Sequence, residues 1–129
     1  MDMSSSYKPA MLLSMLQHVN ERGSARIDDV VQSFHQFYLN RLHCGLRVER
    51  QSNTMARAGD LCEDEVRALM LRMPFRKFEH KKFISYDRND VAFLRFSGNL
   101  WRQLSDGDKT ALRDYCEAAV TRYYERIEA

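Results

Sequence analysis

The residues best suited to do chemistry are a cluster of basic side chains between positions 72 and 82, where Glu79 is the only acidic residue. The cluster consists of Arg72, Arg76, Lys77, His80, Lys81 and Lys82. Arg67 precedes it and Arg88 follows it. Lys and Arg side chains contact phosphates and release counterions, and Arg also reaches base edges. The cluster therefore predicts binding of double-stranded DNA, with a solvated basic turn as the alternative.

One tripeptide in this cluster, Glu79-His80-Lys81, has the Glu-x-Lys arrangement of many metal-dependent nucleases. Such enzymes need a second carboxylate beside the first to bind Mg²⁺. The nearest upstream acids, Asp60 and Asp64, fall on a predicted helix rather than on a strand. The candidate metal ligands match no common zinc spacing; they are His35, His43, Cys44 and Cys62. We therefore expect no enzyme, no cofactor and no metal site.

Three aromatic residues, Phe75, Phe78 and Phe83, interleave with the basic side chains. Aromatic rings between cations can stack on the bases of a single strand. Their helical and strand spacing favours a place in the core instead.

The composition is that of one globular domain, with 129 residues, 44% hydrophobic residues and a formal net charge of +2. No apolar run approaches the roughly 20 residues that span a bilayer. The first residues lack the basic and apolar parts of a signal peptide. The three cysteines are an odd number without close pairing, which is typical of reduced thiols. We expect a cytoplasmic protein.

Apolar residues at helical spacing predict two helices in the first third of the chain. The first begins at Tyr7, with Pro9 in its first turn, and stops at Gly23. Residues 24–27 form a connector or an isolated strand. The second helix follows a cap at Asp28 and ends before Gly45. Residues 45–59 are then a polar loop that is mobile or ordered by a partner.

A third helix opens at Asp60 or Cys62, and Asp60 and Glu63 have the spacing of a capping box. Pro74 ends or kinks it. Two runs rich in aromatic and β-branched residues, 83–86 and 91–96, flank a polar turn at 87–90 and predict a β-hairpin.

The last helix, residues 105–128, has Ser105 as its cap and Asp108 three residues later. At about 1.5 Å per residue it is roughly 35 Å long, which exceeds what a small core covers. We expect part of its apolar face to meet another subunit or another domain, through Tyr115, Val120, Tyr123, Tyr124 and Ile127.

This order predicts a mainly α fold with a small β-hairpin, an α+β arrangement like a winged helix. Three helices precede the hairpin, which is the wing, and a long C-terminal helix follows. Residues 1–6 are expected to be a flexible N-terminus, and 7–129 a single domain. The third helix would read the DNA, with Arg67 or Arg76 at a base edge and Arg88 in a minor groove.

The segment Ser6-Tyr7-Lys8-Pro9-Ala10-Met11-Leu12-Leu13 resembles the "YKP-x-LLLA" helix of accessory domains in bacterial restriction and phage-defence proteins. There it accompanies helicase or HNH-nuclease modules. Three later segments, 37–41, 73–79 and Leu100-Trp101, are similar to further landmarks of the group. The resemblance spans most of the chain and implies a DNA-sensing or targeting part of a defence system.

The chain is also similar to the sulfur-recognising domain of phosphorothioate-dependent restriction enzymes, which has a Lys-Pro helix start and a Pro-Phe step. In that family an aromatic residue before the proline helps to line the sulfur pocket. Met73 takes this position here, and the Asp-Gly-Leu-Trp segment expected soon afterwards is missing. Both departures argue against sulfur reading.

The function predicted from the sequence is a non-catalytic module that binds double-stranded DNA, with dimerisation through the last helix. The alternative is a protein–protein interaction subunit of a defence complex that uses the same helix. Winged-helix scaffolds serve both purposes.

Overall fold

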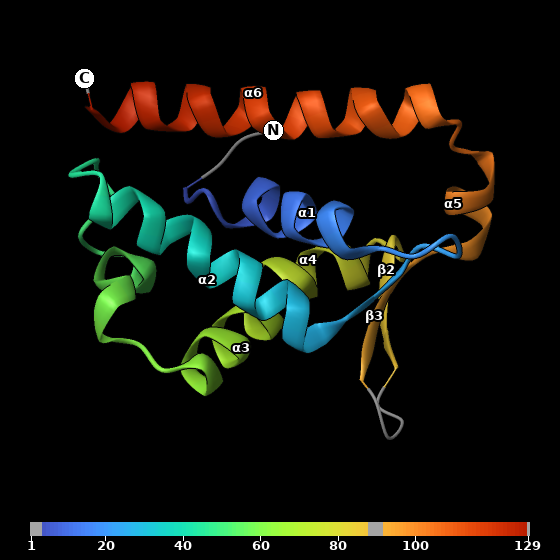
Figure 1. Ribbon diagram of the computed structural model, residues 1–129, viewed down its shortest axis with the longest axis horizontal. Coiled ribbons are helices and arrows are strands. Elements are labelled where there is room, and N and C mark those ends of the chain that lie inside the picture. The colour runs from blue at the N-terminus through green and yellow to red at the C-terminus, as the bar shows by residue number, and fades with distance from the viewer. Residues whose placement is uncertain (1–3, 88–91, 129) are drawn as a thin grey trace.

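The computed structural model describes residues 4–87 and 92–128, which form a set of packed helices with one small sheet towards one end of the molecule (Figure 1). The helices are α1 (Tyr7–His18), α2 (Ile27–His43), the 3-10 helix η1 (Thr54–Asp60), α3 (Glu63–Arg72), α4 (Pro74–His80), α5 (Gly98–Gln103) and α6 (Asp106–Glu128). The strands are β1 (Ser24–Arg26), β2 (Ile84–Asp87) and β3 (Phe93–Phe96). The predicted α+β class is confirmed.

The sheet is antiparallel, with the order β1-β3-β2. The predicted hairpin is confirmed, because β2 pairs with β3 and Ile84 lies opposite Phe96. The short segment after α1 is a true strand, since Ala25 pairs with Leu94 of β3. Arg88, which was predicted at the tip of the wing, lies outside the described residues.

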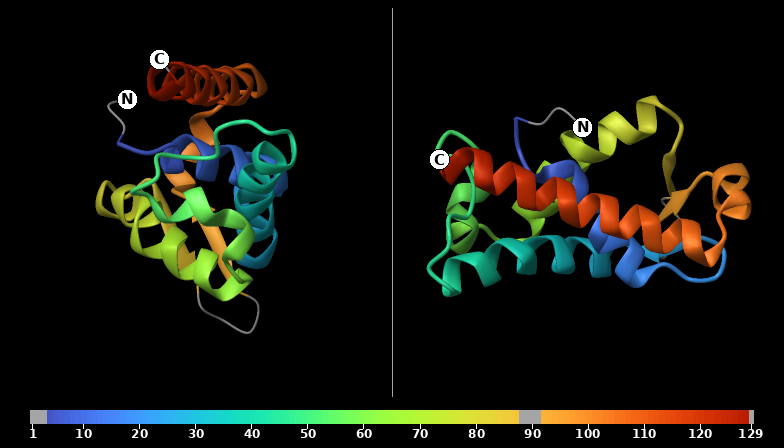
Figure 2. Two further views of the ribbon diagram at one scale, coloured as in Figure 1. Left: turned by 90° about the vertical axis from the view of Figure 1, so that its left-hand side faces the viewer. Right: turned by 90° about the horizontal axis from the view of Figure 1, so that it is seen from above.

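The core is built around α1, which packs against α2, α4 and α6. Met11 and Met15 of α1 are completely buried, as are Phe34 and Tyr38 of α2. Figure 2 shows α6 as an upper layer, with the other helices and the sheet beneath it. The long last helix therefore covers the core of its own chain.

The start predicted for the second helix is shifted, whereas for the third helix one of the two predicted starts, Cys62, is the one observed. The second helix begins at Ile27 rather than after Asp28, because the Ile27 N–H donates to Ala92 O beside the sheet (3.0 Å). The cap of α3 is Cys62, whose N–H donates to Glu65 (3.0 Å) and holds the pKa of that carboxyl below its usual value. Asp60 cannot be this cap, because it ends η1 and an extended Leu61 follows.

Pro74 divides the predicted third helix in two, as expected. The helix α3 ends at Arg72, and α4 restarts with Pro74 in its first turn, where a missing N–H costs nothing. Most of the basic cluster therefore lies on a helix rather than in a turn. At the other end, Ser105 and Asp108 cap α6 reciprocally (3.0 Å each), and this pairing holds the pKa of Asp108 low.

The interface predicted on the last helix is wrong for Tyr123 and Tyr124, whose side chains are 0% and 4% exposed. They are buried within the chain because this half of α6 packs onto α1 and the N-terminal segment. Val120 and Ile127 are half-buried beside them. Tyr115 alone of the five is exposed, at 46%.

Two segments expected to be mobile belong to the fold. Ser6, at the end of the predicted flexible N-terminus, is completely buried. In the predicted loop over residues 45–59, Val48, Glu49, Met55 and Ala58 are all buried. The loop is ordered by its own chain and needs no partner.

The cysteines are free thiols: Cys44 and Cys62 are exposed and Cys116 is buried. Burial raises the pKa of the Cys116 thiol to about 11. Across residues 4–87 and 92–128, no helix has the length and apolar character of a membrane span.

Candidate functional site

A cavity of about 900 Å³ opens where four segments meet. These segments are the N-terminal residues leading into α1, the loop after α2, the α3–α4 junction and the end of α6. The lining residues are Ser4, Ser5, Tyr7, Lys8, Arg50, Arg72, Met73, Pro74, Arg76, Lys77, His80 and Arg126. We call this the basic cavity.

The basic cavity has six Lys and Arg side chains and one His in its lining, and no Asp or Glu from the described part of the chain. Three ion pairs of the described residues use no side chain of this lining: Arg41–Glu128, Arg67–Asp28 and Arg95–Asp87. Clustered cations without carboxylates produce a positive potential that attracts anions. Met73 (42% exposed) and Pro74 add an apolar part to the same wall.

The structure brings together four of the residues predicted to bind DNA, because Arg72, Arg76, Lys77 and His80 share the wall formed by α3 and α4. Three further cations were missed, namely Lys8, Arg50 and Arg126. No run of charge singles them out, because each lies on a different segment, and Lys8 stands out only as part of the Tyr7-Lys8-Pro9 helix start. Only the tertiary fold places them beside the cluster.

The other predicted DNA-binding residues lie outside the basic cavity. Lys81 and Lys82 are exposed directly after α4. Lys82 adopts a left-handed backbone conformation (φ 61°), which lets the chain turn from α4 towards β2. The Arg67 guanidinium forms an ion pair with Asp28 of α2. Arg67 therefore ties two helices together.

The first turn of α3 has the opposite charge. Glu63, Asp64 and Glu65 are adjacent and exposed there. Carboxylates at the start of a helix interact favourably with its dipole but repel DNA phosphates. The positive surface of the molecule thus begins at Arg72 and continues along α4.

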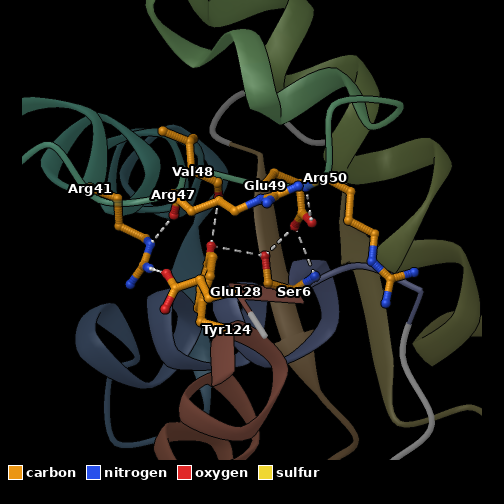
Figure 3. Close-up of polar contacts among 8 residues, drawn as sticks. All are labelled: Ser6, Arg41, Arg47, Val48, Glu49, Arg50, Tyr124 and Glu128. Atoms are coloured by element: carbon orange, nitrogen blue, oxygen red, sulfur yellow. Dashed lines mark hydrogen bonds and ion pairs between the residues drawn. The ribbon is translucent and has the colours of Figure 1, made fainter. Parts of the chain in front are cut away.

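Beneath the basic cavity lies a buried carboxylate, Glu49, which is only 3% exposed. It accepts hydrogen bonds from the Ser6 N–H (3.0 Å), the Ser6 hydroxyl (2.6 Å) and the Arg50 N–H (2.9 Å), as Figure 3 shows. Asn53 (3.3 Å) and the Tyr123 hydroxyl also donate to it. A buried carboxylate is tolerated because so many donors replace its water.

This network holds part of the cavity wall. The Tyr123 ring lies under two of the cations, 5.5 Å from Arg50 Cζ and 5.9 Å from Arg126 Cζ. Cations near an aromatic face are attracted by its quadrupole. Since the Tyr123 hydroxyl donates to Glu49, the buried carboxylate fixes the ring that orients both arginines.

The same region is closed on its outer side by Arg41 and Tyr124 (Figure 3). Arg41 lies over the Tyr124 ring (3.4 Å to the centroid) and pairs with Glu128 (3.3 Å). The Tyr124 hydroxyl donates to Val48 O (2.7 Å). The loop after α2 is therefore fastened to the end of α6 on both sides of Glu49.

Four of the six tyrosines have raised pKa values in the folded chain: Tyr7, Tyr38, Tyr123 and Tyr124. Burial is the largest cause, and for Tyr124 it raises the pKa from 10.0 to about 12. Such groups stay protonated in the folded state while they ionise in the unfolded chain. Their contribution to stability is full below pH 10 and is lost as the pH rises towards and through 12.

We therefore expect the free energy of unfolding to hold steady up to pH 9 and to fall above pH 10, by about 1.4 kcal/mol per pH unit for each such tyrosine. Urea titrations at several pH values, followed by circular dichroism, measure this. Absorbance at 295 nm should show these tyrosines ionising together with unfolding. Ionisation of all six tyrosines while the helices remain intact would contradict the burial of the cluster.

Chemically, the basic cavity is suited to binding an anion. Among the described residues, no three His, Cys, Asp or Glu side chains gather as a metal site would require. Comparison with protein-family models, with curated proteins and with solved structures finds no match to this chain.

Proposed function

We propose that this chain is a non-catalytic module that binds double-stranded DNA through the outer face of α4 and the rim of the basic cavity. The observation that carries the proposal is the rim of the cavity, where the exposed side chains of Arg72, Arg76 and Lys77 lie together and no carboxylate of the described residues lines the cavity. Exposed cations on one face can contact several phosphates of one duplex and release their counterions.

The arrangement of elements supports a winged-helix assignment for this module. Apart from the inserted η1 and α4, the order α1, β1, α2, α3, β2, β3, with β1 paired to β3, is the one expected of that fold. The acidic first turn of α3 argues against this helix entering a groove by its N-terminus. We place the DNA instead against Arg76 and Lys77 of α4 and the adjacent Lys81 and Lys82.

The alternative function, an assembly subunit that dimerises through α6, has lost its main support. Tyr123 and Tyr124, which motivated it, are internal. The resemblance to accessory domains of restriction and phage-defence proteins favours DNA targeting, and a cytoplasmic location accords with that role.

The test reverses four charges together, in the variant R76E/K77E/K81E/K82E. Binding of a labelled random duplex, followed by fluorescence anisotropy, should weaken by on the order of 100-fold or more, because several phosphate contacts become repulsive. The wild-type affinity should fall steeply with salt. All four residues are exposed, and Lys82→Glu keeps a non-glycine residue at the left-handed position.

The matched control is R22E/R102E/R113E/R122E, which changes the net charge equally at exposed positions away from the cavity lining. This variant should keep most of the affinity. An equal loss in both variants would mean that binding follows total charge and not this surface. Unchanged affinity of the first variant would contradict the proposal.

A further inference from the structure

The cations of the basic cavity differ in how exposed they are. Arg72, Arg76 and Lys77 are exposed, whereas Lys8 and Arg50 are half-buried. The exposed cations form the rim that a duplex can touch. The half-buried cations are less accessible to a smooth duplex than to a group that projects into the cavity.

The size and the lining of the cavity indicate what this group is. A volume of about 900 Å³ is well above the space that a single phosphate fills, and it lies in the range of small-molecule sites. The lining combines cations for phosphate oxygens with an exposed apolar side chain, Met73, that suits the face of a base. A nucleotide offers both parts that this lining suits, a phosphate and a planar, weakly polar ring.

Resting on the proposed function, we infer that the basic cavity receives one unpaired nucleotide of the bound DNA, with its phosphate between Lys8 and Arg50 and its base against the exposed side chain of Met73. The duplex on either side of that nucleotide lies along α4. Moving a nucleotide out of a paired stack costs a few kcal/mol, and the cost is lowest where it is already unpaired. The module is therefore selective for DNA with a bulged or mismatched nucleotide.

The cavity is organised in advance for this ligand. The backbone N–H of Arg50 donates to Glu49 (2.9 Å), and the Arg50 guanidinium lies over the Tyr123 ring, with Cζ 5.5 Å from its centroid. A side chain that is already ordered loses less conformational entropy when it binds. This explains why a buried carboxylate sits behind a cavity of positive charge.

The experiment compares two labelled duplexes of equal length and sequence, one perfectly paired and one with a single bulged nucleotide, by anisotropy with the full chain. We expect the bulged duplex to bind at least tenfold more tightly. The variant K8Q/R50Q should remove this preference and leave the affinity for the paired duplex within about threefold. The control R22Q/R113Q removes the same charge elsewhere and should keep the preference.

The outcomes separate the two proposals. Equal binding of both duplexes by the wild-type chain would overturn this inference and leave the DNA-binding function standing. Loss of paired-duplex affinity in K8Q/R50Q, at an unchanged urea midpoint, would also overturn it, because the deep cations would then contact the duplex itself. If neither duplex binds but adenosine monophosphate does, the cavity is a free-nucleotide site and both proposals fail.

Discussion

Replacing Glu49 with alanine is expected to lower the free energy of unfolding by at least about 3 kcal/mol. The side chain is 3% exposed and accepts five hydrogen bonds. Alanine leaves these donors buried, and each unsatisfied donor costs about 1–3 kcal/mol unless water enters. The total free energy of unfolding of a domain of this size is about 5–15 kcal/mol, so the loss is a large part of its stability.

Urea unfolding followed by circular dichroism measures the effect. The variant Tyr123→Phe removes one donor and keeps the ring, so it should cost about 1–3 kcal/mol. Glu125→Gln, at an exposed position of the same helix, should stay within about 0.5 kcal/mol of wild type. A Glu49→Ala variant as stable as Glu125→Gln would show that the buried network contributes nothing.

Replacing Gly23 with alanine should cost about 2–5 kcal/mol, for two separate reasons. Gly23 has φ +77°, a conformation that strains a residue with a Cβ. The new Cβ would also lie 2.6 Å from Cγ of Trp101. That ring cannot easily move, because it stacks on Phe96 (5.3 Å between centroids) and donates to Glu21 O (2.9 Å).

Gly45→Ala is the matched control. Gly45 has nearly the same backbone angle, φ +70°, but a Cβ there meets nothing within 4 Å. It should show the backbone cost alone, about 1–2 kcal/mol. The difference in unfolding free energy between the two variants measures the clash with Trp101. Trp101 is the only tryptophan of the chain, so the tryptophan fluorescence should change in Gly23→Ala and not in Gly45→Ala. Equal costs would mean that the ring gives way freely.

The parts of the fold that the sequence predicts correctly depend on neighbouring residues. The capping pair Ser105 and Asp108 lies within one turn, and the effect of Pro74 is a steric property of its own ring. The hairpin follows from two short runs around a turn. Each of these signals acts over a few residues, so the printed sequence contains all of it.

The parts that could not be predicted depend on contacts between distant segments. The segment around Ala25 is a strand only because it pairs with β3, where Leu94 lies opposite Ala25. Ser6 is buried only because Glu49 and Tyr38 pack against it. The candidate site shows the same division. Arg72 to His80 stand out as a run of charge, whereas Lys8, Arg50 and Arg126 join them only after folding.

The network around Glu49 also bears on how the chain is made. Tyr123 is synthesised 74 residues after Glu49, which takes about 4–15 seconds at ribosomal rates of 5–20 residues per second. Throughout that time α6 does not yet cover α1, and the Glu49 carboxylate lacks the hydrogen bond from Tyr123. Completion of the domain must therefore wait for α6 to emerge, and the uncovered apolar surface is a natural substrate for chaperones that act at the ribosome.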